Sequence, residues 1–233
     1  MNLLECPDEA LPFPAQYDAN GRGRWAGKVS WNGRGKGLDQ FKEANGQYLE
    51  PSQILSGGNH MVYAVIDRDS CRWYTYLKAV FEAIDNKQSE YNWLITATDI
   101  VAHSDRLDAL NTSVRWIYKN GKSIAVPAPD YYFLSGEELT KIITIDDSQW
   151  IWGVLSGFEK SIPLDEILRY PLPEAEGYKG FWKNPPSIQH PLASVEIVLW
   201  DSSLVLLFSK NKEIIDSFRL AFPRSQNLSE FNS

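Results

Sequence analysis

Hydrophobic and polar residues alternate most clearly in the last part of the chain, over residues 190–223. Residues 194–200 alternate and then become apolar, an Asp-Ser-Ser turn interrupts the run, and residues 204–209 are apolar again. Asn211 is a suitable N-cap because its side-chain oxygen can accept a free backbone N–H, and Pro223 cannot continue a helix. The pattern predicts two strands joined by a tight turn, followed by a capped helix.

A second helix is predicted from Cys71 to Ile84, with Asp69 or Ser70 as its N-cap. Its apolar residues recur at the spacing of one helix face, and this predicts a stripe that packs against the core. The residues of the stripe are Trp73, Leu77, Val80, Phe81 and Ile84.

Shorter patterns complete the set of predicted elements. Strands are expected at 61–66, 92–100 and 149–155, and a hairpin at 114–126, where Asn-Gly separates two apolar runs. Ser135 and Glu138 have the spacing of a capping box, which predicts a short helix. Two further features are a small helix from Pro163 to Arg169 and a long loop from Pro171 to Pro186.

Strands in hairpins with helices inserted between them indicate an α+β fold, with a mostly antiparallel or mixed sheet and helices packed on one face. We expect a single domain over residues 1–233, in which 1–20 form an irregular N-terminal segment. The alternative is a subdivision near 127–130, where a proline-rich linker separates two halves that each hold strands and a helix.

Composition is that of a soluble globular protein, with 43% hydrophobic and 23% charged residues and no apolar run long enough to span a membrane. The first residues have neither the basic nor the apolar segment of a secretory signal. Cys6 and Cys71 lie far apart and lack metal-ligand spacing. We therefore expect a cytoplasmic protein with no disulfide, metal or cofactor.

The net charge of −7 conceals a cationic tract from Gly21 to Gly37, with five cations, six glycines and no acid. Subtracting +5 from −7 leaves −12 on the rest, and an acidic body suits a basic partner. The tract could instead hold a phosphate or single-stranded nucleic acid, although its spacing does not fit a phosphate-binding loop. We expect no nucleic acid there. The anion-binding residues of this alternative are Arg22, Arg24, Arg34 and Lys36.

Residues of a hydrolytic triad occur close together at His190, Asp201 and Ser202 or Ser203, but no Gly-x-Ser-x-Gly motif is present and Asp-Ser-Ser is typical of a turn. A small enzyme that uses His190 with Asp201, or an acid pair, is an alternative. Acid pairs and aromatic residues in loops also suit a partner surface. The residues that we assign to such a surface are Asp146, Asp147, Glu174, Glu176, Phe181 and Trp182.

The segments from Tyr91 to Thr96, from Gln189 through Ser203 and from Phe222 to Ser225 resemble the small cytoplasmic α+β proteins that serve as immunity partners of bacterial polymorphic toxins. The resemblance implies a protein without enzymatic activity that binds and occludes a toxin, often a basic nuclease. The acidic body fits this partner, whereas the cationic tract would repel it unless it lies elsewhere. We therefore expect an immunity-type binding protein whose partner is a protein, and the alternatives are the small enzyme and the nucleic-acid module.

Overall fold

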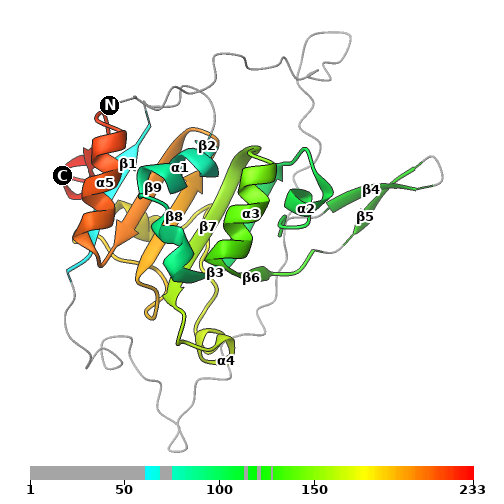
Figure 1. The fold of residues 1–233 in the computed structure, drawn as a ribbon, viewed down its shortest axis with the longest axis horizontal. Coiled ribbons are helices and arrows are strands. Elements are labelled where there is room, and N and C mark those ends of the chain that lie inside the picture. Colours follow the sequence, from blue (N-terminus) through cyan, green and yellow to red (C-terminus); the bar gives the residue numbers. More distant parts are fainter. Residues whose placement is uncertain (1–60, 69–74, 113–114, 120–121, 127) are drawn as a thin grey trace, which may run out of the picture. The chain divides into compact units, whose positions relative to one another are not determined.

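An eight-stranded sheet organises the described part of the chain (Figure 1). The computed structural model describes residues 61–68, 75–112, 115–119, 122–126 and 128–233, and these belong to one compact unit. Every strand pair in it is antiparallel. The strand order is β10-β1-β9-β8-β7-β3-β6, with β2 pairing to β7, and β4 and β5 form a separate hairpin. The fold class is therefore α+β, as the sequence predicts.

The strands have the following bounds: β1 Tyr63–Asp67, β2 Thr75–Tyr76, β3 Tyr91–Val101, β4 Arg115–Lys119, β5 Lys122–Val126, β6 Tyr131–Ser135, β7 Gln149–Glu159, β8 Val195–Trp200, β9 Leu204–Ser209 and β10 Gln226–Asn227. The α-helices are α1 Leu77–Ala83, α2 Asp105–Asp108, α3 Gly136–Ile145, α4 Leu164–Ile167, α5 Lys212–Ala221 and α6 Leu228–Phe231. Among the described residues, the single-turn 3-10 helices are η2 Lys87–Glu90 and η3 Lys179–Trp182.

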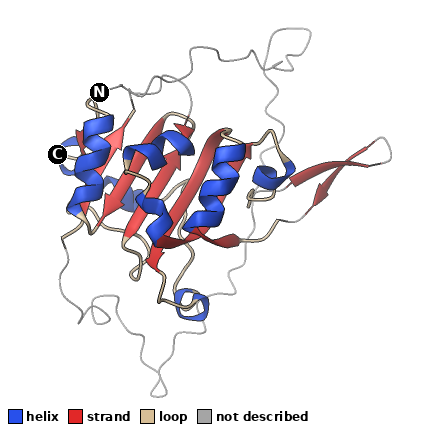
Figure 2. Cartoon of the chain, in the orientation of Figure 1, coloured by secondary structure: helices blue, strands red, loops and turns tan. Residues whose placement is uncertain are grey.

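The three longest helices, α1, α3 and α5, lie side by side on one face of the sheet, as Figure 2 shows by colour. Each buries an apolar stripe at helical spacing, formed in α5 by Ile214, Ile215 and Phe218 and in α3 by Leu139 and Ile143. These side chains pack on the strand residues that point to the same face and form the larger core. We call this side the helix face.

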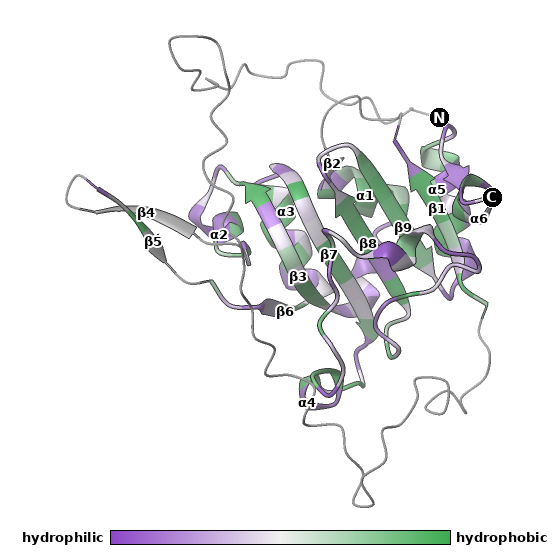
Figure 3. Ribbon diagram, turned by 180° about the vertical axis from the view of Figure 1, so that it is seen from behind, coloured by the Kyte–Doolittle hydropathy of each residue, from purple (hydrophilic) through white to green (hydrophobic). Residues whose placement is uncertain are grey.

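The opposite face is covered by irregular chain and single-turn helices (Figure 3). Phe181 of η3 and Leu228 of α6 are buried against strand residues that point away from α1, α3 and α5. Ile167 of α4 joins a third apolar cluster with Phe158 and Leu94. We call this side the loop face, and it supplies the candidate site.

Several predicted elements are confirmed together with their local signals. Asn211 caps α5 by accepting from the Glu213 N–H at 2.9 Å. Ser135 and Glu138 form the predicted capping box at the start of α3. In the hairpin, Lys119 pairs with Lys122, in agreement with a two-residue turn.

The helix predicted from Cys71 to Ile84 is wrong at Thr75 and Tyr76. α1 begins at Leu77, because Thr75 and Tyr76 pair with the start of β7 as β2, and the Thr75 hydroxyl donates to the Trp150 carbonyl. Helix propensity is a small energy that strand pairing readily overrides. The second half of the stripe, Leu77 to Ile84, is buried as predicted. Residues 69–74, with the two candidate caps, lie outside the described residues.

Two strands differ from the prediction. None of the predicted strands covers residues 131–135, but these residues form β6, which pairs with β3. β7 continues past its predicted end through Gly157, where a Cβ would lie 2.5 Å from Val195 Cγ1 and 3.1 Å from the Trp93 ring. A glycine therefore interrupts the pattern of the strand while allowing Trp93 to pack closely against it.

Candidate binding surface on the loop face

The connection between α4 and β8 crosses the loop face and carries Glu174, Glu176 and Trp182 from the predicted partner set. Its backbone is irregular, so its polar groups need partners other than a strand or a long helix. Ala175 and Phe181 anchor it by complete burial among Val154 and other residues of the sheet. Burial of these side chains fixes the exposed residues of the connection in place.

Polar side chains hold the same connection at its two ends. The Thr96 hydroxyl of β3 donates to the Pro173 carbonyl at 2.8 Å. The Gln189 side chain bridges the connection: Nε2 donates to the Glu174 carbonyl at 2.9 Å, and Oε1 accepts from the Glu174 N–H at 3.1 Å. The Gln189 backbone N–H then donates to both carboxyl oxygens of Glu196, at 3.3 and 3.4 Å. The loop is thus bonded to β3 and β8.

Glu196 is the single ionisable residue of β8, and it is completely buried. It lies opposite Ser156 of β7, whose hydroxyl donates to Glu196 Oε2 at 3.2 Å. Burial raises the pKa of Glu196 to about 8, against the hydrogen bonds from Gln189 and Ser156, which lower it. At neutral pH the group is mainly the neutral acid, which reduces the cost of burying it. Sequence reasoning missed this residue, although a single glutamate within an apolar strand was a signal for it.

Four aromatic side chains meet beside this network, and we call them the aromatic surface: Trp152 of β7, Trp182 of η3, Trp200 of β8 and Phe231 of α6. The ring centroids of Trp152 and Trp200 are 4.9 Å apart, and those of Trp182 and Trp200 are 5.5 Å apart, both edge to face. Trp182 and Phe231 are 6.3 Å apart, and the Arg68 guanidinium lies 5.3 Å from the Phe231 ring centre. The three tryptophans are half-buried, and Phe231 is 38% exposed.

A β-bulge brings Trp152 to this surface. Asp99 of β3 pairs with Trp152, but the next residue, Ile100, pairs with Trp150, so Ile151 is an extra residue in β7. Residues two apart in a regular strand point to the same face, and the bulge breaks this rule. Trp150 is consequently buried in the core of the helix face, whereas Trp152 points to the loop face. The turn after β8 secures the bulge, because the Ser202 N–H donates to the Ile151 carbonyl at 2.9 Å.

The predicted partner residues do not form one surface. Glu174 and Glu176 are exposed on the loop and Trp182 is half-exposed, whereas Phe181 is completely buried and anchors the loop. It packs edge to face on Tyr178 at 4.8 Å.

Asp146 and Asp147 follow α3 and share no element with the loop residues. Asp146 is buried and accepts from the Ser148 hydroxyl. Burial acts to raise its pKa, but hydrogen bonds from Ser104 and Ser148 lower the pKa below its usual value. Asp147 is exposed and accepts from the Lys78 N–H at 3.3 Å. Asp146 therefore has a structural role at the end of α3.

The triad suggested by His190, Asp201 and Ser202 is not assembled. His190 is buried, its Nε2 lies 3.1 Å from the Ile167 carbonyl, and its Nδ1 accepts from the Leu192 N–H at 3.3 Å. Both ring nitrogens are thus engaged, and burial lowers the pKa of the imidazole. Asp201 is exposed beyond the far end of β8, roughly 20 Å along the strand from His190.

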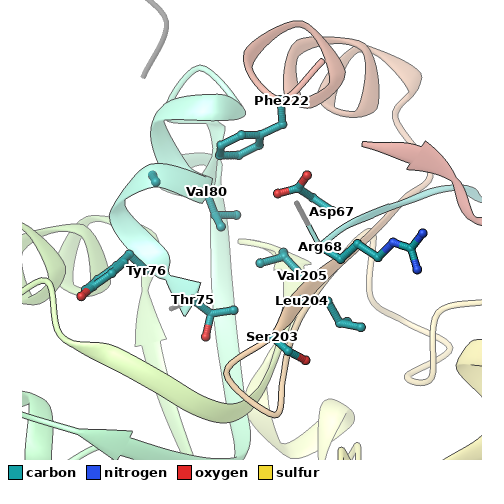
Figure 4. Close-up of a pocket in the computed structure, with 10 residues that line it drawn as sticks. Asp67, Arg68, Thr75, Tyr76, Val80, Ser203, Leu204, Val205 and Phe222 are labelled. Carbon is teal, nitrogen blue, oxygen red and sulfur yellow. The ribbon is translucent and has the colours of Figure 1, made fainter. Parts of the chain in front are cut away.

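A small hollow lies on the helix face between α1, β1, β9 and the end of α5 (Figure 4). Val80, Val205 and Phe222 line its apolar side, and Asp67 and Thr75 contribute polar atoms. Its volume is about 20 Å³, which is enough for a water molecule. The hollow is too small to be a substrate site.

Comparison with known proteins adds no relative. Among the described residues, no group of histidine, cysteine and acidic side chains could hold a metal ion, and no described helix is long and apolar enough to cross a membrane. The cationic tract 21–37, with Arg22, Arg24, Arg34 and Lys36, lies outside the described residues, so the nucleic-acid alternative stays a prediction. No family model, curated protein or solved structure matches the chain.

Proposed function

We propose that this protein is a non-enzymatic binding protein that engages a basic protein partner through the aromatic surface. The observation that carries the proposal is the meeting of Trp152, Trp182 and Trp200, from three separate elements, in half-exposed edge-to-face contact. Tryptophan and arginine dominate the binding energy of protein interfaces, because large rigid rings bury much area at little cost in conformational entropy.

Charge supports a basic partner. The loop that carries Trp182 presents Glu174 and Glu176 to solvent, and it also presents Lys179 and Lys183, so the support for a basic partner comes from the net charge of −7 of the chain as a whole. Acids at the rim of an interface accelerate association with a cationic partner at low salt. An immunity protein that occludes the active surface of a basic toxin domain would combine these properties.

Co-expression with the product of the adjacent reading frame tests the proposal. We expect a stable complex with a basic domain encoded there. Trp182→Ala should weaken the complex at least about tenfold, as expected for an interface hot spot. Leu220→Ala is the matched control, because Leu220 is a 66% exposed apolar residue of α5 on the other face of the sheet.

The charge contribution is tested separately with the double variant Glu174→Lys, Glu176→Lys. We expect slower association at low salt and nearly unchanged dissociation. Equal affinity for wild type and a folded Trp182→Ala variant would reject the aromatic surface. If the neighbouring product is basic and yet forms no complex, the immunity function is rejected.

A further inference from the structure

The two edge strands of the sheet, β10 and β6, differ in how well they are protected against pairing with a further strand. At one end β10 consists of two residues, Gln226 and Asn227, and α6 follows it directly. At the other end β6 has five residues that pair with β3 on one side. Within the described part of the chain, no strand pairs with the outer side of β6. A very short edge strand protects a sheet because it offers little backbone for a further strand to pair with. β6 is longer and lacks this protection.

The sequence of β6 also favours pairing. Tyr131-Tyr132-Phe133-Leu134-Ser135 contains no charge, proline or glycine, which are the residues that normally protect an edge. All five residues are half-exposed. Leu134 packs toward the helix face, and Tyr131 and Phe133 pack toward the loop face, so apolar side chains lie on both faces beside an added strand.

The charges beside β6 indicate which kind of strand fits. Asp130 is exposed immediately before β6, and Glu137 and Glu138 are exposed just after it. Glu90 and Glu159 are exposed close to Tyr91, at the start of β3. Burial raises the pKa of Tyr91 most, and the negative charges of Glu159 and Glu90 raise it further.

Three cations offset part of this charge. Lys160 bonds Glu137 at 2.5 Å. The hydrogen bonds from Ser135 lower the pKa of Glu138 most, and the positive charge of Lys141 lowers it further. The hydrogen bond to Glu213 raises the pKa of Lys87 most, and the nearby negative charge of Glu90 raises it further.

We propose that the outer edge of β6 accepts an extended, lysine- or arginine-flanked segment of a protein partner as an additional strand. Backbone hydrogen bonds would supply affinity, and the acids at either end would select a cationic segment. A second copy of this chain fits poorly. An antiparallel copy would bring Asp130 next to Glu137 at both ends, and a parallel copy would bring each acid next to itself. The inference that the partner is basic rests on the proposed function, whereas the inference that β6 accepts a strand does not.

The test uses the full chain and a short peptide of alternating valine and threonine with lysines at both ends. Amide hydrogen exchange of residues 131–134 is measured with and without the peptide, and Ser135 is left out because its N–H already donates to Glu138 at 3.0 Å. We expect the outward amides of β6 to exchange freely in the protein alone and to slow at least about tenfold when the peptide is bound. A peptide with glutamates in place of the lysines should bind roughly fivefold more weakly at low salt.

Asp130→Lys is the matched variant, because Asp130 is exposed and precedes the strand. It should reverse part of the preference between the two peptides. The proposal is wrong if β6 is already protected in the dilute free protein, if its protection rises with protein concentration together with a doubled mass, or if neither peptide changes exchange. Trp182→Ala should leave the peptide effect intact, so failure of the aromatic surface and failure of the edge are distinguishable.

Discussion

The two faces of the sheet are built on different physical principles. On the helix face, α1, α3 and α5 satisfy their own backbone hydrogen bonds and contribute apolar stripes to a core of apolar side chains. On the loop face, irregular chain must find other partners for its backbone, and Thr96 and Glu196 of the sheet and Gln189 of the loop itself provide them. The comparison teaches that a face without long helices needs buried polar residues, and that such a face can also hold aromatic rings at the surface.

The largest expected effect is on the helix face. Phe81 is 2% exposed, and Phe81→Ala should lower the free energy of unfolding by about 3–5 kcal/mol because it leaves a cavity. The neighbouring Glu82 is exposed, and Glu82→Ala should change it by less than about 0.5 kcal/mol. Urea unfolding midpoints measure both. Equal effects would show that α1 does not contribute its stripe to the core.

The next effect separates the two groups of predicted acids. Asp146→Lys should destabilise the protein by about 2–4 kcal/mol, because it places a long cation in a buried site that is arranged for a carboxylate. Glu174→Lys, on the exposed loop, should stay within about 0.5 kcal/mol. Thermal unfolding of the two variants decides this. A tolerant Asp146 would place it back among the candidate partner residues.

A third prediction concerns the pH dependence of the loop face. The raised pKa of Glu196, about 8, means that between its ordinary value of 4.5 and pH 8 the folded protein keeps a proton that the unfolded chain releases. Its contribution to stability is therefore full below pH 4.5 and falls by at most roughly 1.4 kcal/mol per pH unit as the pH rises toward 8.

Glu196→Gln removes this titration while it imitates the neutral acid. The variant should be more stable than wild type above pH 8 and should show a flatter stability profile between pH 4.5 and 8. Glu176→Gln, at an exposed position, is the control and should keep the wild-type slope. A Glu196→Gln profile parallel to wild type would mean that Glu196 is ionised in the folded protein.

The smallest effect tests the attachment of the loop. Gln189→Ala removes the side-chain bridge to Glu174 and should cost about 1–2 kcal/mol. Hydrogen exchange should become faster at Glu174 and its neighbours in the loop and stay unchanged in α5. Faster exchange across both faces would instead show that the two faces unfold as one cooperative unit.

Local signals allowed much of the helix face to be predicted. Asn211, the Ser135–Glu138 capping box and the stripe from Leu77 to Ile84 are all short-range patterns, and the structure keeps them. The helix predicted from Cys71 was wrong at Thr75 and Tyr76, because these two residues pair with residues far away in the sequence. A pattern within one segment carries no information about such a partner.

The sequence by itself determined the α+β class, the helix face and the presence of an acidic, aromatic-rich chain, because period and composition are properties of neighbouring residues. Only the tertiary structure decided that Phe181 is an anchor, that Glu196 is buried and that His190 and Asp201 lie apart. The bulge at Ile151 shows the reason most clearly. One extra residue in β7 sends Trp150 to one face and Trp152 to the other, and it is held by a hydrogen bond from Ser202, about fifty residues later in the chain.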